Sequence, residues 1–203
     1  MRTEKTSISK LNDTDFNNLK FGETFTDHMF VCDYEDGKWV DPRVVPYKPI
    51  EIEPSANVFH YGQAVFEGMK GYKDDLGKIW LFRPTENYKR ISISSERLAM
   101  PELGESLFLS ALNELLTLDS DWVKPGIGNS VYIRPFVYTS DLGIAPRLHN
   151  IETDFFIYGL ELGDYLSPEG VTCRISSWKR QEDSSLPLRG KISGAYITSS
   201  LAK

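Results

Sequence analysis

Short alternating segments recur along the whole chain and are separated by helical segments, and this pattern constrains the fold more than any other feature. Alternation predicts a strand at residues 29–34, and the Asp36-Gly37 turn predicts that residues 38–40 return beside it as a hairpin. Further strands are predicted at residues 78–82, 131–138, 154–162 and 171–178. Within 131–138, Tyr132, Arg134 and Phe136 occupy alternate positions, so they are expected to share one side of the strand.

Two longer segments carry helix signals. Thr85 precedes Glu86 and a run that continues to Met100, which predicts a helix with Thr85 as its N-cap and Pro101 as its stop. A second helix is predicted at residues 106–122, because its apolar residues fall largely on one face. Residues 59–66 are expected to form one or two helical turns.

These elements predict an α+β fold. Residues 1–158 are expected to form a small domain, residues 159–170 an interdomain linker, and residues 171–203 the start of a larger domain. A strand, a loop and the first turns of a helix cannot bury a core of their own. We therefore expect the sequence to be a piece of a longer protein.

Composition excludes several classes of protein. The net charge of −6 is spread over mixed acidic and basic residues with no run of one sign, which gives no indication of a nucleic-acid partner. Cys32 and Cys173 form no CxxC pair, so a disulfide framework or a cysteine-based metal site has little support. No window approaches the roughly 18 apolar residues of a membrane span. We expect a cytoplasmic protein without membrane, metal or nucleic acid.

Three basic residues are candidates for chemistry. Arg134 lies among aromatic residues on a predicted strand, where a guanidinium is costly unless it meets an anion, and an internal ion pair with Asp or Glu is the alternative. Arg90, taken alone, is typical of a helix surface. Lys191 follows Gly190 in a turn that leads into a predicted helix, and a lone lysine there is more often solvated.

Four separated motifs favour a functional role for these three basic residues. They are FHYGQAVFEGMK at residues 59–70, LFRP at 81–84 followed by Arg90, YIRP at 132–135, and KISGAY at 191–196. In this order they resemble the branched-chain aminotransferases, which are fold-type IV pyridoxal-phosphate enzymes. The resemblance runs from about residue 25 to the end of the sequence.

The resemblance implies a cofactor and a reaction. It implies pyridoxal 5'-phosphate bound by Lys191 as a Schiff base, with the Arg90 guanidinium at the phosphate and Tyr196 also at the cofactor. The implied reaction is reversible amino transfer between L-leucine, L-isoleucine or L-valine and 2-oxoglutarate, which yields branched 2-oxo acids and L-glutamate. The implied assembly is a homodimer.

The resemblance also implies roles for substrate-binding residues. Tyr132 matches the phenol that meets the substrate α-carboxylate, while Arg134, with Tyr61 and Tyr165, matches the groups that receive the distal carboxylate of glutamate. Phe66 and Tyr196 match the walls of the aliphatic pocket. Leu142 and Ile144, in the loop at residues 141–144, match residues that reach the neighbouring subunit's site.

Some features depart from the family or leave alternatives open. Residues 193–196 read SGAY where GGNY is frequent, which removes one amide hydrogen bond. The acidic partner of the cofactor's ring nitrogen lies beyond residue 203 in the family, so we expect these residues alone to bind the cofactor poorly and to be inactive. A D-amino acid aminotransferase or an aminodeoxychorismate lyase would share the fold, and a noncatalytic dimerisation module would share the small domain.

Overall fold

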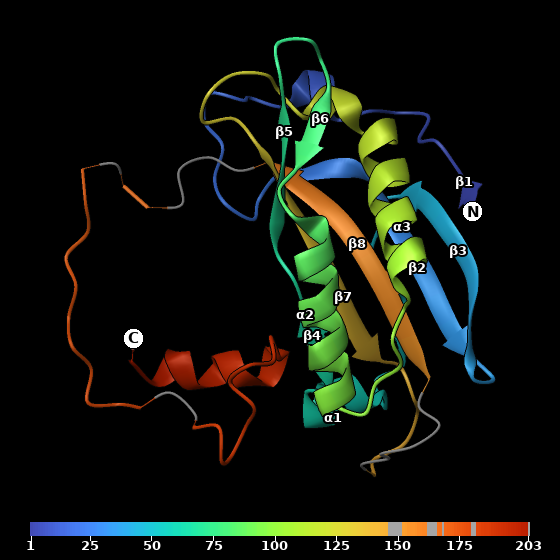
Figure 1. Ribbon diagram of the computed structural model, residues 1–203, viewed down its shortest axis with the longest axis vertical. Coiled ribbons are helices and arrows are strands. Elements are labelled where there is room, and N and C mark those ends of the chain that lie inside the picture. The colour runs from blue at the N-terminus through green and yellow to red at the C-terminus, as the bar shows by residue number, and fades with distance from the viewer. Residues whose placement is uncertain (146–151, 162–165, 168, 180–181, 203) are drawn as a thin grey trace.

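The body of the protein is one mixed sheet with two helices on one face. The computed structural model describes residues 1–145, 152–161, 166–167, 169–179 and 182–202. Sheet neighbours follow the order β1-β3-β2-β8-β7-β5-β6, and β4 pairs with β7. Every pair is antiparallel except β1 with β3. α2 and α3 lie side by side across this sheet (Figure 1), so the predicted α+β class is confirmed.

The elements have the following bounds. The strands are β1 (Arg2–Thr3), β2 (Phe25–Glu35), β3 (Lys38–Pro46), β4 (Ala64–Phe66), β5 (Met69–Lys73), β6 (Ile79–Leu81), β7 (Val131–Thr139) and β8 (Thr153–Glu161). The helices are α1 (Asn57–Tyr61), α2 (Pro84–Arg97) and α3 (Glu105–Leu118), with 3₁₀ helices η1 (Leu11–Asp13), η2 (Ser120–Trp122) and η3 (Ser193–Ala202). No helix in the described part of the chain is both long enough and apolar enough to cross a bilayer.

Most predicted strands form. β2 and β3 make the expected hairpin, and positive φ angles at Asp36 (49°) and Gly37 (77°) are those of the tight turn that suits a twisted hairpin. β6, β7 and β8 cover the other predicted strands up to Glu161. β8 ends at Glu161, so its last residues lie within the expected linker at 159–170. The division into domains stays a prediction.

The helix starting at residue 85 was placed wrongly by its cap signal. α2 begins at Pro84, and no side chain caps it. Proline suits the first helical position because its fixed φ is helical and its missing N–H would have had no partner there. Thr85 therefore lies inside the first turn. The helix ends at Arg97, before the expected Met100.

Two other segments also differ from expectation. Residues 59–66 are not one helical stretch: α1 ends at Tyr61, Gly62 turns the chain at φ 63°, and β4 begins at Ala64. Residues 171–178 form no strand, and Figure 1 shows them running away from the sheet. A strand requires a neighbour for its backbone hydrogen bonds, and no described strand lies beside this segment.

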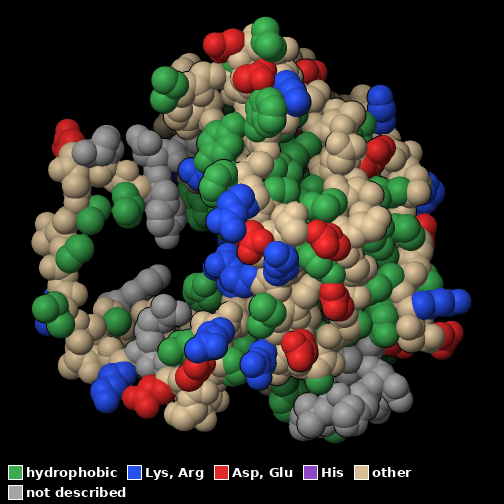
Figure 2. All heavy atoms as spheres, viewed as in Figure 1, with side chains coloured by type: hydrophobic (Ala, Val, Ile, Leu, Met, Phe, Trp, Pro, Cys, Tyr) green, Lys and Arg blue, Asp and Glu red, His purple; other side chains and the backbone are tan. Residues whose placement is uncertain are grey.

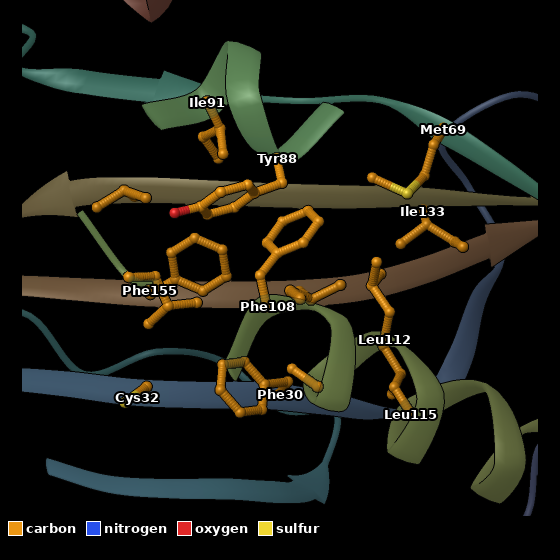
Figure 3. Packing of buried hydrophobic residues seen from close by; sticks show 14 of the residues in the cluster. Phe30, Cys32, Met69, Tyr88, Ile91, Phe108, Leu112, Leu115, Ile133 and Phe155 are labelled. Carbon is orange, nitrogen blue, oxygen red and sulfur yellow. The ribbon is translucent and has the colours of Figure 1, made fainter. Parts of the chain in front are cut away.

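The main core lies between the sheet and the two long helices. Phe108 of α3 is fully buried, and its ring meets those of Phe155 of β8 at 6.1 Å and Tyr88 of α2 at 5.7 Å. Phe30 of β2 packs edge-on against Phe155 in the same cluster (Figure 3). Burying each such side chain contributes roughly 1.5–3 kcal/mol. This packing holds α2 and α3 against the sheet.

β7 changes neighbours along one edge, and Pro135 lies at the change. Residues 131–133 pair with β5, and residues 136–138 pair with β4. The Pro135 carbonyl accepts a hydrogen bond of 2.8 Å from the Glu67 N–H, in the break between β4 and β5. The amide and carbonyl of one strand residue point to the same side, so the N–H that proline lacks faces this break and no ladder bond is lost.

Gly68 lies in the same break, directly beside Tyr132. A Cβ atom at Gly68 would come within 2.0 Å of the Tyr132 hydroxyl oxygen and 2.7 Å of its ring carbon Cζ. No side chain fits there unless the Tyr132 ring moves. The absence of a side chain at Gly68 therefore leaves the space that the Tyr132 ring occupies.

Replacing Gly68 with alanine should displace Tyr132 and lower the free energy of unfolding by about 1–3 kcal/mol, as overpacked sites do. Gly71→Ala is the matched control, because its Cβ would meet Leu116 at 3.6 Å, an ordinary contact. The control should change stability by less than about 1 kcal/mol. Urea unfolding measures both, and equal losses in the two variants would contradict this account of the Gly68 site.

Glu161 should make stability depend on pH. It is buried at the end of β8, its Oε1 has no hydrogen-bond partner among the described residues, and burial raises its pKa to about 8. In the unfolded chain a glutamate ionises near pH ~4.3. Between about pH 5 and pH 8 the unfolded state therefore binds fewer protons than the folded state. The free energy of unfolding should fall as pH rises through this interval, by at most about 1.4 kcal/mol per pH unit.

Glu161→Gln removes the titrating group while keeping its size. The free energy of unfolding of this variant, measured by urea at both ends of the interval, should change less with pH than that of the parent protein. Parallel pH profiles for the two proteins would show that Glu161 does not titrate in this range.

Candidate active site

A cavity of about 780 Å³ opens beside β7, where the last described part of the chain returns to the body. Its lining is formed by Phe21, Phe66, Lys70, Tyr132, Arg134, Phe136, Tyr158, Lys191, Ser193 and Tyr196. Three of these side chains are cations and none is a carboxylate. Figure 2 shows lysine and arginine side chains gathered where the body borders the hollow beside the C-terminal residues. The cavity is therefore suited to an anionic ligand with an apolar part.

Alternation along β7 brings three of these residues together, as expected. Tyr132, Arg134 and Phe136 face the cavity, whereas Ile133 is fully buried on the other side of the strand. The spacing of two residues in the sequence thus becomes one wall of the cavity.

Arg134 has no acidic partner in the described part of the chain. Its Nη2 donates to the Tyr132 hydroxyl at 2.8 Å, and its guanidinium carbon lies 4.5 Å from the centre of the Phe66 ring. Its Nε is buried and has no hydrogen-bond partner among the described residues. A buried donor without a partner is costly. The internal ion pair considered above is not formed with any described residue, so the guanidinium can serve an external anion.

Lys191 has its amine in the same cavity. Its Nζ donates to the Tyr196 hydroxyl at 2.8 Å and lies 4.5 Å from the centre of the Phe66 ring. The Phe66 and Tyr196 rings are 5.0 Å apart and tilted by 51°. The amine is thus flanked by two aromatic rings, and its hydrogen bond to Tyr196 is exposed to solvent.

The backbone of Lys191 is fixed on both sides. The Phe66 N–H donates to the Lys191 carbonyl at 3.1 Å, and the Lys191 N–H donates to the Ser94 hydroxyl at 2.8 Å. Ser94 is fully buried in α2 and donates its own proton to the Arg90 carbonyl at 2.7 Å. Its lone pairs are therefore left to accept from Lys191. These bonds attach the lysine to both β4 and α2.

Arg90 is paired with a buried carboxylate. Its Nε and Nη2 both donate to Glu67, the second at 2.7 Å. Glu67 is fully buried, and its hydrogen bonds raise the pKa of the Arg90 guanidinium. Arg90 does not line the cavity itself, although the cavity phenols Tyr196 and Tyr132 also raise its pKa electrostatically.

Three other expected site residues do not line the cavity. Tyr61 ends α1 and is 44% exposed. Leu142 forms a β-bridge with Ala56, and it and Ile144 are exposed by 47% and 74%. Tyr165 is outside the described residues. The structure thus brings together Phe66, Tyr132, Arg134, Lys191 and Tyr196, and it does not bring Tyr61, Leu142 or Ile144 to them.

Several cavity and supporting residues were not predicted. Phe136 shares the alternation of Tyr132 and Arg134, so the pattern pointed to it. Lys70 and Ser193 lie inside quoted motifs without an assigned role. Glu67 also lies inside the first motif without an assigned role. Phe21, Tyr158 and Ser94 carried no local signal, because their part depends on contacts between distant segments.

The cavity fits a phosphate-bearing aromatic cofactor. The amine of Lys191 is available to a carbonyl, the aromatic rings suit a flat ring system, and the lining carries only positive formal charge. The Arg134 guanidinium in the same lining offers donors to a further anionic group. The residues that could hold such a cofactor are Lys191, Tyr196 and, from α2, Arg90.

Comparison with known proteins agrees with this geometry. The chain is 49% identical over 168 residues to a probable branched-chain-amino-acid aminotransferase of Synechocystis, which covers 81% of the chain and 52% of that protein. It is 48% identical over 152 residues to branched-chain-amino-acid transaminase 1 of Bacillus subtilis, which covers 74% of the chain and 42% of that protein. The chain spans about half the length of these relatives. No protein-family model matches it.

Solved structures give the same relation. The branched-chain aminotransferase of Thermoproteus uzoniensis with norvaline aligns at a TM-score of 0.68 and 26% identity, over 86% of this chain and 55% of that one. The T.th. branched-chain aminotransferase complexed with N-(5'-phosphopyridoxyl)-L-glutamate aligns at 0.67 and 26%, over 89% and 55%. The predicted resemblance is therefore confirmed: over most of its length the chain is similar to the branched-chain aminotransferases.

Proposed function

We propose that the protein containing this chain is a pyridoxal-phosphate-dependent branched-chain aminotransferase. The observation that carries the proposal is the convergence of the Lys191 amine and the Arg134 guanidinium on one aromatic cavity whose lining has no carboxylate. The names of the relatives support the same activity. Because the chain spans about half of those relatives, the proposal concerns the longer protein.

Lys191, Tyr196 and Arg90 would hold the cofactor. When bound, pyridoxal phosphate supplies an electron sink that makes the α-proton of an amino acid removable. The structure of a relative complexed with a phosphopyridoxyl-glutamate supports this choice of cofactor. In this chain the Lys191 amine would bind it covalently, and the Arg90 guanidinium would donate to its phosphate.

Lys191 would also move a proton. Its Nζ is directed by the 2.8 Å hydrogen bond to the Tyr196 hydroxyl, so the amine has one preferred orientation when free. A neutral lysine amine can accept a proton from the substrate α-carbon and return it to another carbon as general base and then acid.

Two kinds of substrate would share the cavity. Phe66 and Tyr196 offer an apolar wall to a branched side chain, and Arg134 offers donors to the distal carboxylate of glutamate or 2-oxoglutarate. The Tyr132 phenol would meet the α-carboxylate. Burial raises the pKa of Tyr158 in the same lining, which keeps that phenol neutral.

The other roles rest on the resemblance. Tyr61 and Tyr165 would assist Arg134 with the distal carboxylate. The exposed side chains of Leu142 and Ile144 are available to a second subunit, which supports a homodimer in which each loop at residues 141–144 completes the partner's site. A cytoplasmic location is part of the same proposal.

Lys191→Ala should abolish transamination in the complete protein. The assay couples L-leucine, L-isoleucine or L-valine with 2-oxoglutarate and measures the glutamate formed. Lys89→Ala is the control, because Lys89 is an exposed lysine of α2 that pairs with Glu86 at 2.8 Å, and it should retain full turnover. Undiminished turnover by Lys191→Ala would refute the proposal, and preference for D-alanine or aminodeoxychorismate as donor would favour the related enzymes of this fold.

Arg134→Gln should separate the two substrate classes. Loss of a guanidinium that donates to a carboxylate should reduce kcat/KM for L-glutamate by about 10- to 100-fold, since such bonds are worth about 1.5–3 kcal/mol. The half-reaction with L-leucine should change only a few-fold, because its side chain has no distal charge. Single-turnover measurements of each half-reaction test this, and equal losses for both donors would exclude a distal-carboxylate role for Arg134.

A further inference from the structure

Glu67 is a fully buried carboxylate whose hydrogen-bonding capacity is satisfied by α2 and its own loop. Arg90 donates to both of its oxygens, Asn87 Nδ2 donates to Oε2 at 2.9 Å, and the Gly68 N–H donates to Oε2 at 3.1 Å. Its own N–H donates to the Pro135 carbonyl in the break between β4 and β5. The backbone and the side chain of Glu67 are therefore both fixed.

The manner of pairing leaves part of Arg90 available. A guanidinium carries five N–H donors in a rigid fork. Glu67 takes Nε and one donor of Nη2, so the side-on pair leaves both donors of Nη1 without a partner among the described residues. The Arg90 side chain is 50% exposed, whereas Glu67 is not exposed at all. One edge of the fork is thus anchored and the other remains open to a ligand.

We propose that Glu67 is a positioning residue that holds Arg90 with its free edge aimed at the cofactor phosphate. The inference rests on the proposed function, since it takes Arg90 as the phosphate ligand. Glu67 does not touch the cofactor and acts only through Arg90. Asn87 and the Gly68 N–H complete the support by holding the carboxylate itself.

Two effects of Glu67 on a phosphate oppose each other. Its negative charge reduces the attraction of Arg90 for a second anion, while its two hydrogen bonds remove most of the rotamer freedom of a long side chain. The opposing charge is partly offset by the further donors from Asn87 and Gly68. Lys70, Arg134 and Lys191 keep the cavity positive even with Arg90 neutralised. For Glu67 to favour phosphate binding, the gain in orientation must exceed the loss of electrostatic attraction.

The test compares pyridoxal phosphate with pyridoxal, which lacks the phosphate, on the complete protein after removal of its cofactor. The dissociation constant of pyridoxal divided by that of pyridoxal phosphate measures the contribution of the phosphate. Arg90→Gln should reduce this ratio by about 10- to 100-fold. Glu67→Gln should reduce it at least about threefold, and it should have no further effect when combined with Arg90→Gln.

A second variant and a control keep the test valid even if substitution of the buried Glu67 impairs folding. Arg90→Lys alters only a half-exposed side chain and keeps the charge, but it lacks the fork, so it should lower the ratio as Glu67→Gln does. Glu86→Gln, at an exposed carboxylate of α2 that pairs with Lys89, should leave the ratio unchanged.

The outcomes separate the two proposals. An unchanged or larger ratio in Glu67→Gln or Arg90→Lys, with Arg90→Gln still impaired, would overturn the positioning role of Glu67 and leave the proposed function standing. An unchanged ratio in Arg90→Gln would overturn the assignment of Arg90 to the phosphate and the inference with it.

Discussion

Pairing of β7 along both of its edges is the constraint on which the rest of the structure depends. Val131, Ile133 and Val137 of this strand are buried in the core, while Tyr132, Arg134 and Phe136 line the cavity. A shift of one residue in register would exchange these two sets. The hydrogen bonds that align the core therefore also place the guanidinium and the phenol of the site, and neither can move without the other.

Buried polar groups connect this sheet to α2. Glu67 and Ser94 are both fully buried, and each is paired with residues from another segment of the chain. A buried polar group without partners is costly, so these contacts specify how α2 sits as well as stabilising it. Apolar packing of Tyr88 and Ile91 brings the helix to the sheet. The polar contacts then select one position for it.

Features that depend on neighbouring residues could be predicted from this sequence, whereas features that depend on contacts between distant segments could not. Alternation in β7 was readable because it is local, and four ordered motifs identified five of the ten residues that line the cavity. Thr85 misled because Pro84 was equally suited to begin the helix, and residues 171–178 misled because a strand needs a neighbour that alternation does not reveal. Glu67 and Ser94 were missed because their partners lie 23 and 97 positions away.

α2 is the common reference for the two groups proposed to hold the cofactor. Arg90 and Ser94 are four residues apart, so they lie one above the other on the same face of the helix, about one turn of 5.4 Å apart. Ser94 binds the backbone of Lys191, and Glu67 holds the side chain of Arg90. The backbone of Lys191 and the side chain of Arg90 are thereby both tied to a single turn of α2, although Lys191 and Arg90 are far apart in the sequence. Because the Lys191 carbonyl is also bonded to Phe66 and the Arg90 side chain to Glu67, α2 cannot bend or rotate here without breaking contacts to both residues.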